Sequence, residues 1–255
     1  PVIATSHTWE NGKNQQSHQD PTIGEALMGE MSDVSRVFFP ADAATAVETM
    51  RRIYAARGVI GCVVAPKRVS ARVFDAAGAA RALDEGAAHV EVEAGPDIQI
   101  VAIGAYQLAE ARRAAARLRE RGRRVLVSVI IEPGRLRAPR DEHEARITLA
   151  DADVARLFAP DLPRVLVSHT RPEPMIGVLR RLDPGPARMR AHGYINRGGT
   201  LDVFGMLFAN HCTWAHLSAS AAEVLGVAVS AFLDEREIAA IEGRGDPGLL
   251  RARRA

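Results

Sequence analysis

Residues 2–65 alternate short runs rich in β-branched and aromatic residues with segments of helical character. This pattern predicts strands at Val2–Thr5, Ser35–Phe39 and Val59–Ala65, with helices at Thr22–Met31 and Ala43–Arg57 between them. Strands separated by helices favour a parallel sheet, because parallel neighbours require a long crossover connection. Ligands of such sheets gather at the carboxyl ends of the strands. His7 and Lys67 each follow a predicted strand and are therefore expected at this edge.

From residue 69 to residue 94 the pattern loosens into an Ala-rich helix and a strand at His89–Glu93, and a second α/β series follows. Its predicted strands are Ile98–Ile103, Arg124–Ile131 and Arg164–Ser168, and its predicted helices are Tyr106–Arg121, Ala152–Phe158, Met175–Leu182 and Thr213–Leu225. The stretch Glu132–Leu149 is rich in Pro and charge, and we expect it to wrap the surface or a partner. We place the domain boundary between residues 68 and 69.

Composition is that of an ordinary globular protein, with 47% hydrophobic and 25% charged residues. The net charge is only +2, and the Arg-rich run 112–124 is interleaved with Glu110 and Glu120, so we predict a solvated helix there and no nucleic-acid partner. No run approaches the roughly 18 apolar residues of a membrane span, and no signal core is visible. Cys62 and Cys212 show neither a disulfide framework nor metal-ligand spacing. We expect a cytoplasmic protein with no membrane partner.

Residues 13–21 concentrate polar chemistry that the rest of the chain lacks. The chain has nine Asn and Gln residues, and five of them fall at residues 11–19. It has 31 Arg but two Lys, Lys13 and Lys67. A compact ammonium group can bind a phosphate or hydroxyl group as a point charge where the guanidinium fork is too large. Chance placement of two rare residues is the alternative.

Four motifs in order carry a resemblance to a known family. Asn14 and the run Ser17–Pro21 match the loop His-Asn-Gly-Phe-Ser-His-Gln-Asp-Pro, although Lys13, Gln15 and Gln16 differ from it. The segment Val37–Ala43 resembles a strand ending in Pro-x-Asp-x-Asn, with Ala44 in place of Asn, and Val63–Lys67 resembles a strand that ends in a phosphate-binding Lys. Gly193-Tyr194, Gly198-x-Thr200 and Met206 with Asn210 resemble a closing Gly-Tyr, Gly-x-Thr and Met-x-x-x-Asn pattern. Over its whole length the chain resembles the phosphoketolases, within the transketolase-like enzymes.

The resemblance implies an α/β fold: part of a pyrimidine-binding parallel-sheet domain in residues 1–68, followed by a transketolase-type C-terminal α/β domain in residues 69–255. It implies thiamine diphosphate and Mg²⁺ as cofactors, bound mainly by segments that this chain does not contain. We therefore expect a shortened chain or, in preference, a split or processed chain with a companion that carries the diphosphate-binding domain. A homodimer or a heterotetramer is expected.

The resemblance and the chemistry of the residues together suggest site roles for a sugar-phosphate substrate. His7 and His18 would exchange protons with substrate hydroxyl groups, while Lys13, Asn14, Gln19 and Lys67 would bind the substrate, Lys67 through its phosphate. Cofactor-binding residues stay unassigned, and no metal ligand is predicted.

Each of these roles has a plainer alternative. Asp20 reads as a helix N-cap with Pro21 at the first helical position, so His18 would lie beside a helix start that favours its neutral, basic form. The alternatives are a structural hydrogen bond for His18, a turn for Asn14 and simple exposure for Lys67. Trp9 would line the sugar channel or pack the loop.

The remaining histidines fit structural roles better. We expect core or interface positions for the C-terminal histidines, which are His192, His211 and His216. His169 ends a strand, so a ligand role competes there with an Arg171–Glu173 network that braces the loop.

The departures in the loop leave the reaction type open. A phosphoketolase-like lyase acting on ketose phosphates of the xylulose 5-phosphate type is the main prediction. Transketolase-type transfer, sugar-phosphate epimerisation or isomerisation, and a noncatalytic assembly subunit are the alternatives.

Overall fold

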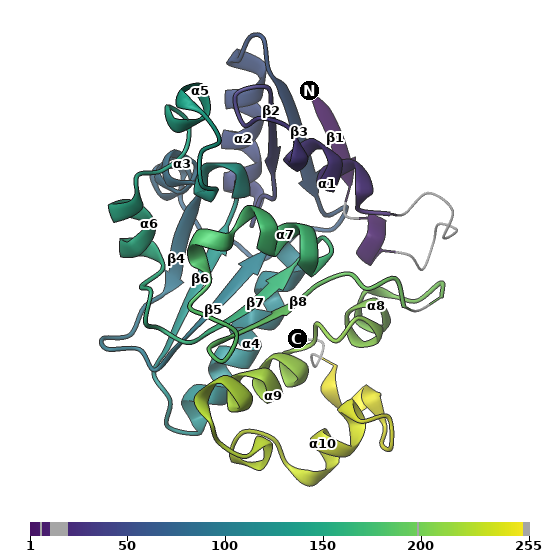
Figure 1. The fold of residues 1–255 in the computed structure, drawn as a ribbon. Coiled ribbons are helices and arrows are strands. Elements are labelled where there is room, and N and C mark those ends of the chain that lie inside the picture. The colour runs from purple at the N-terminus through teal and green to yellow at the C-terminus, as the bar shows by residue number, and fades with distance from the viewer. Residues whose placement is uncertain (6, 11–19, 198, 252–255) are drawn as a thin grey trace.

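The computed structural model describes residues 1–5, 7–10, 20–197 and 199–251, and it contains two sheets (Figure 1). The small sheet has the order β1-β3-β2 and consists of β1 (Val2–Thr5), β2 (Ser35–Phe38) and β3 (Ile60–Ala65). All its pairs are parallel, with Val2 opposite Cys62 and Ser35 opposite Ile60. Helices α1 (Thr22–Gly29) and α2 (Ala43–Ala55) connect the strands. The predicted alternation in residues 2–65 is therefore confirmed.

The large sheet has the order β4-β6-β5-β7-β8. Its strands are β4 (Ala87–Glu91), β5 (Ile98–Ile103), β6 (Val125–Ile130), β7 (Arg164–Ser168) and β8 (Met189–His192). Only β4 runs antiparallel to its neighbour β6, and the other pairs are parallel. The α/β class and the parallel sheets are confirmed.

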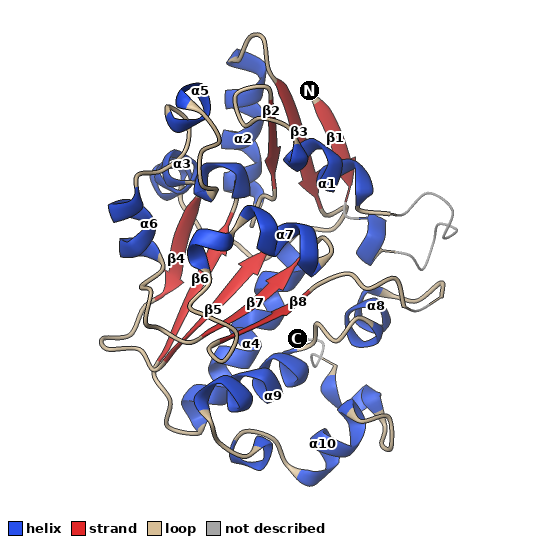
Figure 2. Cartoon of the chain, in the orientation of Figure 1, coloured by secondary structure: helices blue, strands red, loops and turns tan. Residues whose placement is uncertain are grey.

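Helices cover both faces of the large sheet (Figure 2). The helices after β3 are α3 (Ala76–Glu85), α4 (Ala105–Glu120), α5 (Glu142–Ala145), α6 (Asp151–Leu157), α7 (Pro172–Val178), α8 (Val203–Ala209), α9 (Trp214–Leu225) and α10 (Glu235–Ile241). Short 3₁₀ helices include η1 (His7–Trp9), η4 (Pro133–Leu136) and η5 (Arg180–Leu182). Helices α4 and α9 pack on one face of the sheet, and α6 and α7 pack on the other.

The second face of the large sheet shares its core with the small sheet. Side chains of β2 and β3 such as Val37 and Cys62 belong to one buried cluster with Ile103 and Leu166 of the large sheet. The two sheets are thus packed against each other through apolar side chains.

Several elements differ from the sequence-based expectation. The helix expected at Met175–Leu182 begins earlier, at Pro172, and is broken into α7 and η5. Strand β8 and helices α8 and α10 were not predicted. The strand β8 reads Met-Arg-Ala-His, which has no β-branched residue, so its state is set by pairing with β7 rather than by propensity.

The stretch Glu132–Leu149 is ordered against the small-sheet half of the chain. It contains η4 and α5, and Glu132 receives two hydrogen bonds from the Arg36 guanidinium, at 2.6 and 2.7 Å. The fully buried Glu144 carboxylate accepts from the Ser32 N–H at 2.9 Å. The expected wrapping therefore occurs within the chain.

The sequence suggested a solvated helix for the Arg-rich run, but helix α4 buries one of its faces. Its inward face buries Ala111, Ala114 and Leu118. Its arginines reach acidic partners on other elements, as in the 2.7 Å ion pair between Arg117 and Glu237. Among the described residues, no helix combines the length and the apolarity needed to cross a membrane.

Candidate functional site

The carboxyl ends of β1 and β3 form the edge at which His7 and Lys67 were expected. Thr5 is paired with Ala65 in the register of these adjacent parallel strands. His7 begins η1 two residues after β1, and Lys67 follows β3 by two residues, so the structure brings their backbones to one edge of the small sheet. Lys67 is exposed.

Lys13, Asn14, His18 and Gln19 lie outside the described residues, and so does the side chain of His7. The residues on either side of segment 11–19, Glu10 and Asp20, are described.

Glu10 precedes the loop and is held by two groups. Its carboxylate accepts from the Lys67 backbone N–H, at 3.1 Å to Oε1 and 3.3 Å to Oε2. It also accepts a short hydrogen bond from the Tyr106 hydroxyl. Burial, together with the neighbouring Glu10 carboxylate, raises the pKa of Tyr106 above its usual value, so the phenol stays a donor.

Asp20 follows the loop and is held by Arg171, which also binds Glu25. The Arg171 guanidinium lies 2.7 Å from Asp20 Oδ2 and 2.6 Å from Glu25 Oε2. Burial alone would raise the pKa of Asp20, but its hydrogen bonds with Arg171 and Thr22 outweigh burial and lower it. The carboxylate is therefore ionised across the neutral range.

Two local expectations at this end of the loop are wrong. Helix α1 begins at Thr22, with Pro21 rather than Asp20 at the N-cap position, although Asp20 accepts from the Thr22 N–H at 2.9 Å. Arg171 does not brace Glu173, because Asp20 and Glu25 provide two carboxylates brought near by the fold.

A buried aromatic group lies beneath these contacts. Trp9 is fully buried, and its indole N–H donates to the His169 carbonyl at 3.0 Å. Its ring centroid is 6.2 Å from those of His169 and Tyr194, and the Arg171 guanidinium lies 5.6 Å from the Tyr194 ring centroid. Trp9 therefore packs the start of the loop, and His169 is buried with 4% of its surface exposed.

Two of the motifs identified in the sequence have structural roles here. Asp42 caps α2 by accepting from the Thr45 N–H at 2.9 Å, and its other oxygen accepts from the N–H groups of Val73 and Phe74, at 2.7 and 2.8 Å. Asn210 accepts from the Ile195 N–H at 2.8 Å and donates to the Met206 carbonyl at 2.8 Å. Asp42 thus holds the connection between β3 and α3, and Asn210 holds the connection that follows β8.

Of the C-terminal histidines, His216 is buried, His192 is half-buried and His211 is exposed, so the expected core position is found for His216 and not for His211. His192 Nε2 lies 2.8 Å from Ser220 Oγ, and His216 Nδ1 lies 2.7 Å from Thr213 Oγ1. The rings of His211 and His216 are stacked with centroids 5.0 Å apart. Burial, with a contribution from His211, lowers the pKa of His192 to about 4 and that of His216 to about 3.

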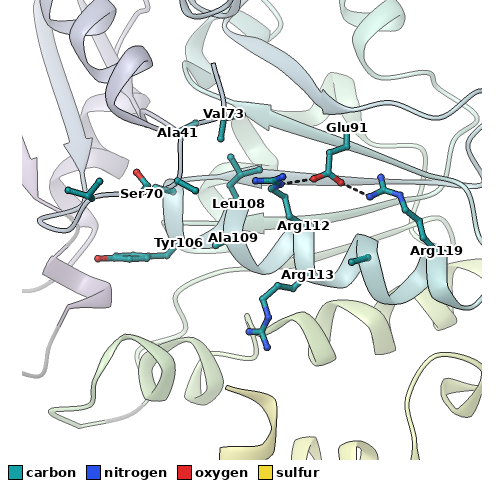
Figure 3. Close-up of a pocket in the computed structure, with 14 residues that line it drawn as sticks. Ala41, Ser70, Val73, Glu91, Tyr106, Leu108, Ala109, Arg112, Arg113 and Arg119 are labelled. Carbon is teal, nitrogen blue, oxygen red and sulfur yellow. Dashed lines mark hydrogen bonds and ion pairs between the residues drawn. The ribbon is translucent and has the colours of Figure 1, made fainter. Parts of the chain in front are cut away.

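A groove of about 620 Å³ runs along α4 beside Tyr106 (Figure 3). Its floor is apolar and includes Leu108 and Ala109. Figure 3 shows Glu91 between the two arginines that it binds, Arg112 at 2.6 Å and Arg119. The charged side chains at this end of the groove, Glu91, Arg112 and Arg119, are therefore paired with one another. By contrast, the cleft beside Asp20 and His169 has a volume of about 10 Å³, roughly the space of one water molecule.

The described residues contain no group of three His, Cys, Asp or Glu side chains that could hold a metal ion. Sequence reasoning missed Glu10 and Tyr106. A signal for Tyr106 existed, because it follows the predicted strand Ile98–Ile103 and so lies at a carboxyl edge.

Models of one protein family match most of the chain. The model for D-xylulose 5-phosphate/D-fructose 6-phosphate phosphoketolase matches residues 1–56, and the model for the XFP C-terminal domain matches residues 67–239. The probable phosphoketolase 2 of Rhizobium meliloti (strain 1021) is 28% identical over 87% of this chain and 29% of its own length. The probable phosphoketolase of Chlorobaculum tepidum is 27% identical over 86% of this chain and 28% of its own length. The chain therefore spans less than a third of these relatives.

Several transketolase structures share this fold. The transketolase of Leishmania mexicana superposes with a TM-score of 0.66 at 16% identity, over 91% of this chain and 30% of its own. A structure described as a split gene transketolase, inactive beta4 tetramer, has a TM-score of 0.57 at 19% identity, over 88% of this chain and 66% of its own. From the family matches together with this fold, we conclude that the chain belongs to the phosphoketolase family and corresponds to its C-terminal part.

Proposed function

We propose that the chain is the C-terminal portion or subunit of a thiamine-diphosphate-dependent phosphoketolase-like enzyme acting on ketose phosphates. In this proposal, residues 1–68 are the latter part of the pyrimidine-binding domain and residues 69–255 are the C-terminal domain. The observation that carries it is the common carboxyl edge of the adjacent strands β1 and β3, which His7 and Lys67 follow by two residues each, in a chain of this family.

The proposed roles follow from the chemistry of each side chain. His7 and His18 exchange protons with substrate hydroxyl groups, because imidazole titrates near neutral pH. Asn14 orients a hydroxyl group, Lys13 and Gln19 add polar contacts, and Lys67 binds the phosphate as a point charge.

Thiamine diphosphate would supply the carbanion chemistry when it is bound. The proposal assigns the Mg²⁺ and diphosphate contacts to a companion chain or segment. This chain's own part is to bind the sugar phosphate, to orient it and to exchange its protons.

The small sheet offers a place for such a companion. Strand β1 lies at the edge of a parallel sheet with three strands, and Ile3 on it is 59% exposed. Parallel sheets are usually buried on both faces. The proposed companion would cover this edge, and a homodimer or heterotetramer would follow. The split transketolase structure supports this arrangement by analogy only.

The reaction is tested by reconstitution. The chain is mixed with the companion half, thiamine diphosphate, Mg²⁺ and xylulose 5-phosphate in phosphate buffer, and products are identified by mass spectrometry. Acetyl phosphate supports the phosphoketolase reaction. A transferred ketol unit or an epimer indicates the corresponding alternative reaction, and binding without turnover indicates an assembly subunit.

Two variants test the assigned roles within that assay. His18→Ala should lower kcat by about 10²- to 10⁴-fold, as expected for loss of a general acid or base, while the melting temperature stays unchanged. Lys67→Ala should chiefly raise KM, because it removes a contact with the bound phosphate. Equal loss of folding in both variants would contradict these roles.

A further inference from the structure

A groove of about 560 Å³ lies beside β4, the strand at one edge of the large sheet (Figure 2). Its walls come from helices α3 and α6, and four consecutive residues of β4 line it, which are Ala87, Ala88, His89 and Val90. Lys67, which we assign to the substrate phosphate, does not line it. A ligand in this groove would therefore be additional to the sugar phosphate of the proposed function.

His89 lies at the end of a row of polar side chains that crosses the sheet. The row runs from Arg164 on β7 through Gln99 on β5 and Ser128 on β6 to His89 on β4. Arg164 Nε lies 3.0 Å from Gln99 Oε1, and Gln99 Nε2 lies 2.8 Å from Ser128 Oγ. Ser128 Oγ lies 2.9 Å from His89 Nδ1. The first three residues are buried and His89 is half-buried, so the row leads from the interior to the groove.

The chemistry of its members gives the row one direction. Arg164 can only donate, so the Gln99 atom that faces it is the carbonyl oxygen. The Gln99 amide nitrogen then donates one hydrogen to Ser128 Oγ and the other to the Leu157 carbonyl, at 2.9 Å. Because Ser128 Oγ accepts from Gln99, its own hydrogen is donated to His89 Nδ1. Neutral His89 therefore carries its hydrogen on Nε2, which has no partner in the described part of the chain and is available to the groove.

The charged groups of the groove leave donors in excess. Each of its two carboxylates has a partner: Asp75 accepts from the Gly78 N–H at 2.6 Å, and Glu85 accepts from Arg156 Nη2 at 2.7 Å. Arg156 uses only this nitrogen within the described ranges, and Arg81 makes no hydrogen bond or ion pair with any described residue. Two guanidinium groups and one imidazole N–H thus remain available, which favours an anionic ligand over a cationic one.

We propose that the groove is a binding site for a small organic anion, a carboxylate or a phosphate ester, which accepts from His89 Nε2–H and from the guanidinium groups of Arg81 and Arg156. Phe74 and Leu157 also line the groove and would contact the carbon skeleton. Burial, together with the nearby Arg156 guanidinium, lowers the pKa of His89, so the neutral donor predominates at pH 7. The inference does not depend on the proposed function.

The direction of the row is tested by NMR on the full, isotope-labelled chain. A long-range proton–nitrogen correlation spectrum distinguishes a hydrogen on Nδ1 from one on Nε2, and comparison with His89→Gln identifies the signals of His89. At pH 7 the wild-type chain should show the Nε2–H form. A hydrogen on Nδ1 would overturn the proposal, because Nε2 would then be an acceptor facing an anion.

Binding is tested with three probes that share a three-carbon skeleton, which are glycerol 3-phosphate, glycerate and glycerol. Each is titrated into the wild-type chain while the ring signals of His89 are followed. The anions should shift these signals in a saturable manner, and uncharged glycerol should not. Tighter binding of glycerol 3-phosphate would assign the site to phosphate esters, and tighter binding of glycerate would assign it to carboxylates.

Two surface variants test the arginines without disturbing the buried row. Arg81→Gln and Arg156→Gln should each weaken binding of the anions by roughly fivefold to tenfold, the scale of a partly exposed charge-assisted hydrogen bond. Arg51→Gln is the matched control, because Arg51 is an exposed arginine on helix α2 that pairs with Glu48 at 2.7 Å, and it should leave the affinity unchanged. The proposal fails if neither anion gives a saturable shift, if glycerol binds equally well, or if the control weakens binding as much as the groove variants do.

Discussion

Gly193 shows how a single residue sets the approach of two strand ends. A Cβ at this position would lie 2.2 Å from the Thr170 carbonyl oxygen, while the next residue, Tyr194, donates its N–H to that same oxygen at 3.0 Å. Glycine is therefore required by a close backbone approach, which places the Tyr194 ring against Trp9 and Arg171.

We expect Gly193→Ala to lower the free energy of unfolding by about 1–3 kcal/mol or more, the cost of inserting a methyl group where no space exists. Gly177→Ala is the control, because nothing lies within 4 Å of the corresponding Cβ position in α7, and helix propensity predicts a change of up to about 1 kcal/mol in the stabilising direction. Chemical denaturation of both variants measures the difference. Equal effects would contradict the close approach.

At the scale of elements, a histidine cluster joins β8, the connection after α8, and α9. His192 lies on β8, His211 follows α8 and His216 lies on α9. His192 and His216 are held neutral by burial, with pKa values of about 4 and about 3. Glu223 is the opposing charge near His192.

This cluster predicts a stability loss in mild acid. The pKa values are lowered in the folded state, so unfolded histidine, with a pKa near 6.5, binds protons first. Stability is complete above about pH 6.5 and falls as the pH drops toward 4, by up to about 1.4 kcal/mol per pH unit for each histidine. Denaturation midpoints measured between pH 7 and 5 give the change in the free energy of unfolding per pH unit. In this range the carboxylates contribute little, because they titrate at lower pH.

A substitution assigns that slope to the cluster. His216→Asn retains an acceptor for the Thr213 hydroxyl and should reduce the slope, whereas His143→Asn, at an exposed position on α5, should not. An unchanged slope in His216→Asn would show that this histidine is not the source of the pH dependence.

At the scale of the whole molecule, the two sheets depend on a shared core. The cluster that joins Val37 and Cys62 to Ile103 and Leu166 is reinforced by the ion pair of Arg36 with Glu132 and by Glu144, which binds the Ser32 N–H. The connection after β3 runs outside this core, since Lys67 and Val69 are exposed.

Cutting that connection should therefore leave the two halves together. In a Lys13→Arg variant, Lys67 is the remaining lysine, and Lys-C should yield fragments 1–67 and 68–255 that co-elute in gel filtration under native conditions. Buried apolar surface provides the attraction between them. Separation of the fragments without denaturant would contradict the shared core.

The sequence by itself determined the α/β class and most elements, because periodicity and helix signals are local. Asp42, for example, caps α2 from three residues before Thr45. It also identified the family through short motifs, and it singled out His7 and Lys67 as residues that follow strands.

Only the tertiary structure decided the partners of Arg171, the Glu10–Tyr106 contact and the extended conformation of Met189–His192 as strand β8. Periodicity could not predict them, because each depends on groups distant in the sequence: Asp20 lies 151 residues from Arg171, and Glu10 lies 96 from Tyr106. Strand β8 lacks β-branched residues and is extended because β7 pairs with it. A local pattern fixes what a segment can form, whereas the choice among distant charged and hydrogen-bonding partners is made when the sheets pack together.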